Sequence, residues 1–205
     1  MILRTERLNL REIAQGDTEA IYAYQSNPCF LRYHPSSIRT EEDVEGLVWQ
    51  LIAWQRERPR FKFQLAIVLA KDNRLIGNCG IRKTAPSACE AELGYEIAPD
   101  HWGQGYATEA GRAMLSFAFR DLKLARVYAS CVAENIASAR VLEKLGMCQE
   151  RRLRRQQWMK DRWWDELCYS LLAEDWLRQQ GELPRECPEQ AMLRGTMLAG
   201  SSVDG

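Results

Sequence analysis

The sequence predicts an α/β (α+β) domain in which helices lie on the faces of a mixed β-sheet. Three observations predict this class. The spacing of apolar residues changes several times between a helical period and strict alternation. Two alternating segments are joined by a short polar turn, which predicts antiparallel neighbours, whereas others are separated by helices, which permits parallel ones. The length of 205 residues is enough for one well-filled domain, or one domain with a tail.

Helical patterns dominate the first third of the chain. After a short strand over residues 8–11, Asp17 is placed to cap a helix that ends before Pro28. Thr40 and Asp43 have the spacing of a capping box, so a second helix begins there. This helix has one apolar face, made of Val44, Leu47, Val48, Leu51 and Ile52.

The middle of the chain alternates with a period of two. Residues 61–69 and 75–81 flank a polar turn and predict an antiparallel hairpin. A further strand over residues 91–97 ends at Pro99. Successive strand residues point to opposite faces, so its apolar and polar side chains separate. Ala91, Leu93, Tyr95 and Ile97 share one face, and Glu90, Glu92, Gly94 and Glu96 share the other.

Helices and strands alternate in the second half. The helix that follows residues 103–108 carries a stripe of small apolar side chains, which permits close packing on a sheet. Gly146 is placed as the C′ residue of a later helix. The predicted order over the whole chain is β-α-α-β-β-β-α-β-α-β-β. Its last four segments are a strand over 126–132, a helix over 137–145, and strands over 149–153 and 166–172.

Two parts are expected along the chain. Residues 1–180 form the domain, and residues 181–205 form a C-terminal extension. We expect this extension to be mobile, because it sustains no periodicity and ends in small and polar residues.

Composition argues against several classes of protein. Lys plus Arg and Asp plus Glu each total 28, so the net charge of zero gives no overall field toward nucleic acid or an anionic membrane. No apolar run reaches the roughly 18 residues of a membrane span, and residues 1–12 have no signal-peptide core. The seven cysteines are odd in number and form no CxxC pair, which suits reduced thiols better than disulfides or zinc. We therefore expect a cytoplasmic protein without a metal, a nucleic-acid partner or a membrane partner.

A glycine-rich turn over residues 103–108 separates a predicted strand from a predicted helix. Backbone N–H groups in such a turn can converge on one anion, and the helix N-terminus adds about half a positive charge. Glycine permits positive φ and the close approach of a ligand. By itself the turn also fits a plain tight turn. It lacks the Gly-Lys-Ser/Thr of a P-loop and, at Thr108, the third small residue of a dinucleotide fingerprint.

Four motifs occur in order at residues 3–11, 91–95, 102–110 and 135–147, and residues 164–172 add a fifth segment. Together they resemble the GNAT acetyltransferase superfamily and, within it, the Rim-like branch, whose members acetylate the N-termini of ribosomal proteins. The resemblance covers about residues 2–178. It implies a mixed, mostly antiparallel central sheet of about seven strands, with helices on both faces.

The resemblance also implies that acetyl-coenzyme A is the cosubstrate and that no metal is required. Backbone amides of the turn would bind the pyrophosphate, and main-chain groups of the preceding strand would bind the pantetheine arm, with help from Asn135. Asn135 equally suits a helix N-cap. The implied contacts are Gly103, Gln104, Gly105, Tyr106, Ala107 and Thr108 for the pyrophosphate, and Leu93, Tyr95, Ile97 and Asn135 for the pantetheine.

Two residues depart from the common family pattern. Trp102 stands where many members have Gln or Arg, as in the Rim-like branch. Leu142 falls where many members have the tyrosine that protonates the departing thiolate, and leucine cannot do so. Ser138 matches a serine that the Rim-like branch offers instead, although a serine in the first turn of a helix can also satisfy backbone groups.

Acetyl transfer needs a base for the amine, a donor for the tetrahedral oxyanion and a proton for the thiolate. We expect Glu92 to be the base, directly or through one water, with Glu90 and Glu96 as alternatives on the same strand face. All three also suit solvated or ion-paired positions. A backbone N–H at Leu93 or Gly94 is the expected oxyanion donor.

The expected acceptor is a protein or peptide N-terminus, attacking the thioester directly. An α-amine with a pKa of about 7.7–8.0 is partly neutral in the cell, whereas a lysine amine near 10.4 is not. A small-molecule amine such as an aminoglycoside, a polyamine or an amino-acid analogue is an alternative, as is a non-catalytic acyl-coenzyme A sensor. Cys131 has no neighbour in sequence that would activate it as a nucleophile. Monomer and homodimer both fit the sequence.

Overall fold

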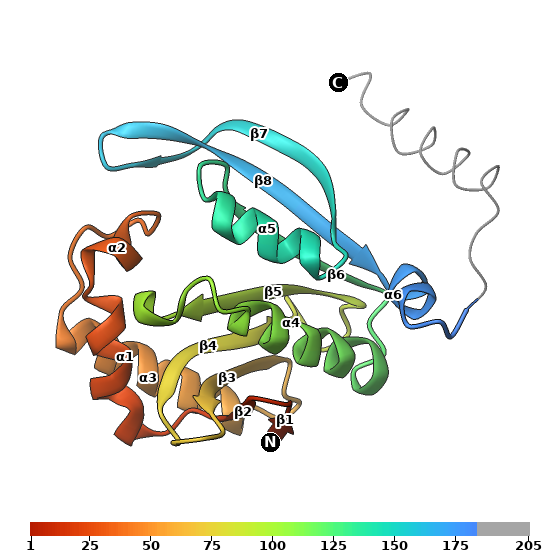
Figure 1. Cartoon of the computed structure of the whole chain (residues 1–205), viewed down its shortest axis with the longest axis horizontal. Helices are drawn as coiled ribbons and strands as arrows, with labels where there is room; N and C mark the ends of the chain where they lie inside the picture. The colour runs from red at the N-terminus through yellow and green to blue at the C-terminus, as the bar shows by residue number, and fades with distance from the viewer. Residues whose placement is uncertain (184–205) are drawn as a thin grey trace. The chain divides into compact units, whose positions relative to one another are not determined.

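The computed structural model describes residues 1–183, and the chain divides into two units, Met1–Ala173 and Glu174–Gly205. The first unit contains the whole sheet (Figure 1). The described part of the second unit contains most of helix α6 (Ala173–Gln179). The segment 184–205, which holds most of the extension that the sequence predicts to be mobile, lies outside the described residues. Within the described part of the chain no helix is long and apolar enough to cross a membrane.

Eight strands form one sheet in the order β1-β2-β3-β4-β5-β6-β8-β7. Only β5 and β6 pair in parallel, so the predicted mixed, mostly antiparallel sheet is confirmed. β1 is one strand more than the seven predicted, because three residues are too few to show alternation. The strands are β1 (Ile2–Arg4), β2 (Leu8–Glu12), β3 (Lys62–Leu69), β4 (Leu75–Arg82), β5 (Glu90–Ile97), β6 (Arg126–Val132), β7 (Cys148–Met159) and β8 (Arg162–Leu172).

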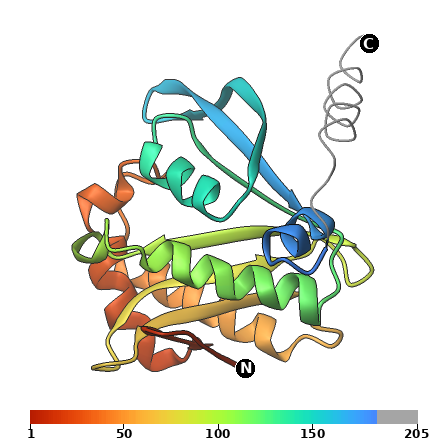
Figure 2. The ribbon, with the colours of Figure 1, turned by 45° about the vertical axis from the view of Figure 1, so that its right-hand side comes forward.

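Helices cover both faces of the sheet, as the sequence predicts. Helices α1 and α3 lie on one face of the first strands, and α4 lies on the other (Figures 1 and 2). Helix α5 packs against β6, β7 and α4. The helices of the first unit are α1 (Thr18–Gln25), α2 (Pro28–Leu31), α3 (Glu41–Arg56), α4 (Tyr106–Ser116) and α5 (Ile136–Lys144), with a π-helical turn over Phe117–Asp121 and 3-10 turns over Gln15–Asp17 and Pro99–His101.

Two of the predicted helix N-caps, those of α3 and α1, have different outcomes. At α3 the Thr40 hydroxyl accepts the Asp43 N–H at 3.1 Å, and the Asp43 carboxylate accepts the Thr40 N–H at 2.9 Å, which confirms the capping box. Asp17 precedes α1 but makes no side-chain cap bond. Its carboxylate accepts both Arg11 guanidinium nitrogens at 2.7 Å and the Ala14 N–H at 2.8 Å instead. A charged partner six residues away outcompetes the helix N–H groups for this carboxylate.

The centre of the sheet is buried on both faces. Residues 64–69 of β3 are all buried, although apolar residues alternate there in the sequence. They are buried because α3 covers one face of the sheet and α4 lies on the other face. Val44 and Val48 of α3 pack in one cluster with Ala66 and Val68 of β3. Full burial of a valine side chain contributes about 1.5–3 kcal/mol to the stability of the fold.

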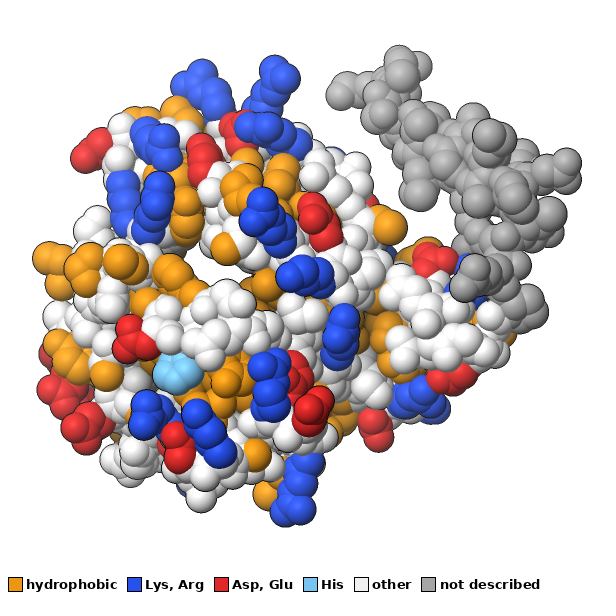
Figure 3. All heavy atoms as spheres, viewed as in Figure 1, with side chains coloured by type: hydrophobic (Ala, Val, Ile, Leu, Met, Phe, Trp, Pro, Cys, Tyr) orange, Lys and Arg blue, Asp and Glu red, His pale blue; other side chains and the backbone are white. Residues whose placement is uncertain are grey.

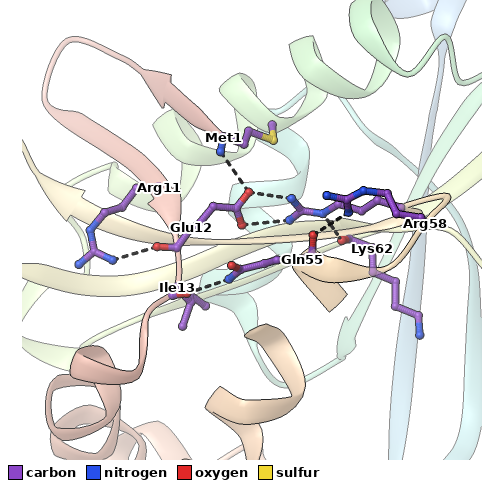
Figure 4. Close-up of polar contacts among 8 residues, drawn as sticks. Met1, Arg11, Glu12, Ile13, Gln55, Arg58 and Lys62 are labelled. Atoms are coloured by element: carbon purple, nitrogen blue, oxygen red, sulfur yellow. Dashed lines mark hydrogen bonds and ion pairs between the residues drawn. The ribbon is translucent and has the colours of Figure 1, made fainter. Parts of the chain in front are cut away.

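Polar contacts fasten the end of α3 to β2 (Figure 4). The Glu12 carboxylate accepts two bonds from the Arg60 guanidinium, at 2.7 and 3.0 Å. The Gln55 side-chain amide donates to the Ile13 carbonyl at 2.8 Å. These bonds hold α3 and the following strand in register with the start of the sheet.

The β7–β8 hairpin is longer than the sequence predicts. The predicted strands 149–153 and 166–172 extend to Met159 and from Arg162, so Trp158 belongs to β7, and Trp163 and Trp164 belong to β8. Much of β7 is polar and exposed, which removes the apolar alternation that marks a strand.

The parallel pair β5–β6 positions the functional site. Pairing is limited to residues 90–92 of β5 with 126–128 of β6. Beyond this point β5 continues beside β4, and β6 continues beside β8 as far as Val132. The two central strands therefore diverge, and a gap opens in the middle of the sheet.

Candidate active site

A cleft of about 190 Å³ lies where β5 and β6 diverge. The space-filling view shows the surface of the first unit hollowed between its β7–β8 side and its α4 side (Figure 3). The cleft brings together four predicted site residues, Glu92, Leu93, Tyr95 and Ser138. Its lining consists of residues 92–96 of β5, Gln64, Asn78 and Arg82 of β3 and β4, Ala129 and Ser130 of β6, and Ser138 and Leu142 of α5.

The register of β5 decides which backbone groups face the gap. The Ala98 N–H donates to the Ile76 carbonyl at 2.7 Å, which directs the even-numbered residues of β5 toward β4. The Gly94 amide therefore belongs to the β4 ladder, and Leu93 lies at the point of divergence. The backbone groups of Tyr95 and Ile97 turn toward the gap. The Ile97 carbonyl already accepts the Trp102 indole N–H at 2.7 Å.

The glycine turn leads from this gap to the start of α4. Gly103 and Gly105 have φ values of 72° and 83°, a conformation that glycine adopts without strain. The first bond of the helix runs from the Glu109 N–H to the Gly105 carbonyl at 3.0 Å. The N–H groups of Tyr106, Ala107 and Thr108 precede it and point out of the helix N-terminus. This geometry suits a phosphate group.

Three residues, Thr5, Arg7 and Glu109, fasten the turn to the first strands, and we call them the clasp. The Glu109 carboxylate accepts the Thr5 hydroxyl at 2.6 Å, the Arg7 N–H at 2.9 Å and the Arg7 Nε at 2.6 Å. Arg7 also donates through Nη1 to the Gln104 carbonyl at 3.0 Å, and its guanidinium lies 4.5 Å from the centre of the Tyr106 ring. The clasp has no signal in the sequence, because Thr5 and Arg7 lie about a hundred positions from Glu109.

The clasp should hold the turn in its anion-binding shape. We expect Arg7→Ala to weaken acetyl-coenzyme A binding about five- to tenfold, since it removes charge-assisted hydrogen bonds from the turn. Calorimetric titration measures this change. Arg4→Ala is the matched control, because Arg4 is exposed and its side chain makes no hydrogen bond or ion pair within residues 1–183. Equal affinities in the two variants would contradict the role of the clasp.

The contribution of the clasp to stability also depends on pH. Burial raises the pKa of Glu109, but the bonds from Thr5 and Arg7 outweigh it and hold the pKa below the ordinary value of 4.5. The contribution of the clasp is therefore fully present above about pH 4.5 and is lost as the pH falls through the lowered pKa.

The three carboxylates on the polar face of β5 have different surroundings. Glu92 is 41% exposed and its Oε2 lies 3.3 Å from Arg82 Nη2. Glu90 is ion-paired with Arg126 at 2.8 Å and does not line the cleft. Glu96 is held by neutral donors, which are the Tyr24 hydroxyl at 3.1 Å, the Gln25 amide at 2.8 Å and the Asn78 amide at 2.8 Å.

The hydrogen-bond donors around Glu96 could not be predicted from the sequence pattern. Asn78 is the cross-strand neighbour of Glu96, so it could be found only once the β4–β5 register was known. Tyr24 comes from α1, 72 positions away. Burial and then the Glu96 charge raise the pKa of Tyr24 well above its ordinary value, so its phenol remains a donor at neutral pH. Gln64 and Arg82 complete the polar floor, with Arg82 Nη1 donating to Gln64 Oε1 at 3.1 Å.

The start of α5 closes the other side of the cleft. The Asn135 side-chain oxygen accepts the Ser138 N–H at 3.2 Å, so Asn135 caps the helix. The Tyr95 hydroxyl lies 2.9 Å from Ser138 Oγ and 3.0 Å from the Ser138 carbonyl oxygen. Leu142, which stands where many family members have a tyrosine, lines the same cleft as Tyr95 and Ser138.

Cys131 of β6 lies against Ser138 but remains a thiol. Burial raises the pKa of Cys131 to about 11, and its contact with Ser138 opposes this rise. At neutral pH the unreactive thiol therefore predominates over the nucleophilic thiolate. We expect Cys131→Ala to keep turnover within about twofold of the wild type, as measured by release of free coenzyme A. An acetylated Cys131 in the wild type and loss of activity in this variant would contradict direct transfer.

A gap in the sheet that leads to a turn whose geometry suits a phosphate fits a long thioester carrying a pyrophosphate, so the fold and the cleft fit the class of proteins that transfer acyl groups from coenzyme A. Residues 7–148 match the family described as "Acetyltransferase (GNAT) domain". The chain belongs to the GNAT acetyltransferase family, and it is an acetyl-coenzyme A-dependent N-acetyltransferase.

Known proteins of this kind are similar over most of the chain. The uncharacterized N-acetyltransferase YnaD of Bacillus subtilis is 32% identical over 176 residues, covering 86% of this chain and 99% of YnaD. The crystal structure of a GNAT-family acetyltransferase from Bacillus anthracis is 32% identical with a TM-score of 0.75, and covers 85% of this chain and 99% of that one. RimL, a ribosomal L7/L12 α-N-protein acetyltransferase in complex with coenzyme A, shares the fold with a TM-score of 0.75 at 18% identity, over 85% of this chain and 99% of RimL.

Proposed function

We propose that the chain transfers the acetyl group of acetyl-coenzyme A to the α-amine of a protein or peptide N-terminus, as Rim-like enzymes do. The observation that carries this proposal is the ion pair between Glu92 and Arg82, whose atoms lie 3.3 Å apart. The carboxylate that serves as the base is therefore also bound to a guanidinium. An α-amine, whose pKa is about 7.7–8.0, needs the least help from such a base. RimL, which has the same fold, is named for this kind of acceptor.

The coenzyme occupies the gap between β5 and β6 in this proposal. Its pyrophosphate binds the N–H groups of residues 103–108, and its pantetheine runs beside the free backbone edge of Tyr95 and Ile97. The side-chain amide of Asn135 has its nitrogen available for the pantetheine, since its oxygen serves the cap. The thioester then lies near Leu93, whose position at the divergence supports it over Gly94 as the oxyanion donor.

Transfer proceeds by direct attack of the neutral amine on the thioester carbonyl. The N–C bond forms, the carbonyl electrons move to oxygen, and the proton lost by nitrogen goes to Glu92, directly or through one water. When the tetrahedral intermediate collapses, the C–S bond breaks and its electron pair goes to sulfur. Ser138 donates its hydroxyl proton toward that sulfur.

A cytoplasmic location belongs to the same proposal, because the six described cysteines are free thiols.

A cationic small molecule is the second candidate acceptor. The charges of Arg82 and Glu92 offset each other, whereas Glu96 has only neutral donors among the described residues. A second ammonium group, as in a polyamine, would supply the missing positive charge.

A panel of acceptors separates the two candidates. Free coenzyme A release is measured with a peptide bearing a free α-amine, with the same peptide N-terminally blocked but carrying a lysine, and with a linear polyamine. We expect the free α-amine peptide to have the highest kcat/KM. A polyamine or lysine acceptor that exceeds it more than tenfold would overturn the assignment to protein N-termini.

A further inference from the structure

We propose that Tyr95 is a positioning residue that turns the Ser138 hydroxyl toward the departing thiolate, and so compensates for the leucine at position 142. This proposal rests on the proposed function of the cleft. It assigns a role to a side chain that the sequence offers only as a main-chain contact.

The geometry brings the two hydroxyls together from opposite sides of the gap. Tyr95 comes from β5 and Ser138 from the first turn of α5, 43 positions later. Their oxygens are 2.9 Å apart, and both residues line the cleft together with Leu142. Because a strand and a helix carry the pair, both hydroxyls have fixed positions relative to the gap.

The hydrogen count limits what each hydroxyl can do. Burial raises the pKa of Tyr95 above its ordinary value, so the phenol keeps its single hydrogen at neutral pH. That hydrogen can go to the Ser138 carbonyl at 3.0 Å or to Ser138 Oγ at 2.9 Å. When Tyr95 donates to Oγ, the Ser138 hydrogen is free to point at a sulfur in the gap. Cys131 is the other side chain against Ser138, and its thiol is a weak donor and weak acceptor.

The chemical step follows from these positions. As the C–S bond breaks, the electron pair moves to sulfur, and the Ser138 hydrogen passes to the thiolate while Ser138 takes a replacement proton from water. The proton that the amine loses to Glu92 then passes to the hydroxide left by that water, so no net proton is gained or lost by the protein. Tyr95 stays protonated throughout, because its hydrogen is engaged in the bond to Ser138 Oγ and does not point at the sulfur. Its part is to hold Ser138 in the donating orientation.

Tyr95→Phe tests this role, because phenylalanine keeps the ring and removes only the hydroxyl. We expect kcat to fall about five- to tenfold, with the Kd of acetyl-coenzyme A and the KM of the acceptor within twofold of the wild type. Tyr22→Phe is the matched control, since Tyr22 is partly buried and its hydroxyl makes no hydrogen bond in the part of the chain that the structure describes. Turnover of Tyr95→Phe equal to the wild type would overturn the proposal.

A double-mutant cycle separates positioning from simple packing. If Tyr95 acts through Ser138, Tyr95→Phe should have no further effect on kcat once Ser138→Ala is present. Fully additive losses, or a lower Tm together with weaker coenzyme binding, would overturn the proposal and assign Tyr95 a structural role. Failure of the proposed function gives a different result, because the wild type would then release no thiol with any amine.

Discussion

Replacing Gly105 with valine should weaken acetyl-coenzyme A binding about a hundredfold while the domain stays folded. Gly105 has a φ of 83°, where a β-branched residue costs about 1–3 kcal/mol. The backbone can relieve this strain only by changing the φ of the turn, which moves the N–H groups of residues 106–108 away from a common anion. A hundredfold loss corresponds to about 2.7 kcal/mol of binding free energy. Calorimetric titration with acetyl-coenzyme A measures it directly.

Gly181 provides the matched control for this variant. It has nearly the same conformation, with a φ of 75°, and belongs to the second unit rather than to the turn. Gly181→Val should therefore carry a similar backbone cost and keep the affinity for acetyl-coenzyme A. If Gly105→Val binds the coenzyme within twofold of the wild type, the turn is not the phosphate site.

Replacing Glu92 with glutamine should lower kcat about a hundredfold at pH 7 and leave the affinity for acetyl-coenzyme A nearly unchanged. General base catalysis contributes roughly 10²–10⁴-fold, and an acceptor amine that is already partly neutral depends on it least. The loss should shrink as the pH rises through about 8, because the α-amine then loses its proton without help. Rates of coenzyme A release between pH 6 and pH 9 test both statements.

Glu90 and Glu96 are the comparisons for Glu92. Glu90→Gln should keep wild-type turnover, because Glu90 is 50% exposed, ion-paired with Arg126 and outside the lining of the cleft. Glu96→Gln should mainly raise the KM of the acceptor. If instead Glu92→Gln keeps full turnover across this pH range and Glu96→Gln loses it, the base is Glu96.

Much of the fold can be predicted from local sequence patterns. The capping box at Thr40 and Asp43, the β3–β4 hairpin and the strand–turn–helix around Gly105 depend on residues a few positions apart, and all three are present in the structure. The local prediction at Asp17 is only half right, because Arg11 takes the carboxylate that was expected to cap α1.

The site depends more on contacts between distant segments. The pairs Arg7–Glu109 and Tyr95–Ser138 are 102 and 43 positions apart, and no spacing rule connects them. The first forms because α4 packs against β2, and the second because the start of α5 lies across the gap from β5. Glu92, the last residue of β5 paired with β6, and Glu96 line the cleft, whereas Glu90 does not, although all three alternate on one face of β5 in the sequence.

The most direct test of the account is the stoichiometry of transfer by the wild-type chain. Acetyl-coenzyme A and a peptide with a free α-amine are supplied together, and free thiol and N-acetylated peptide are counted in the same reaction. The account predicts equal amounts of both products, and no thiol release above background with the N-terminally blocked peptide. Tight binding of acetyl-coenzyme A, with neither product formed from any peptide or small amine, would contradict it.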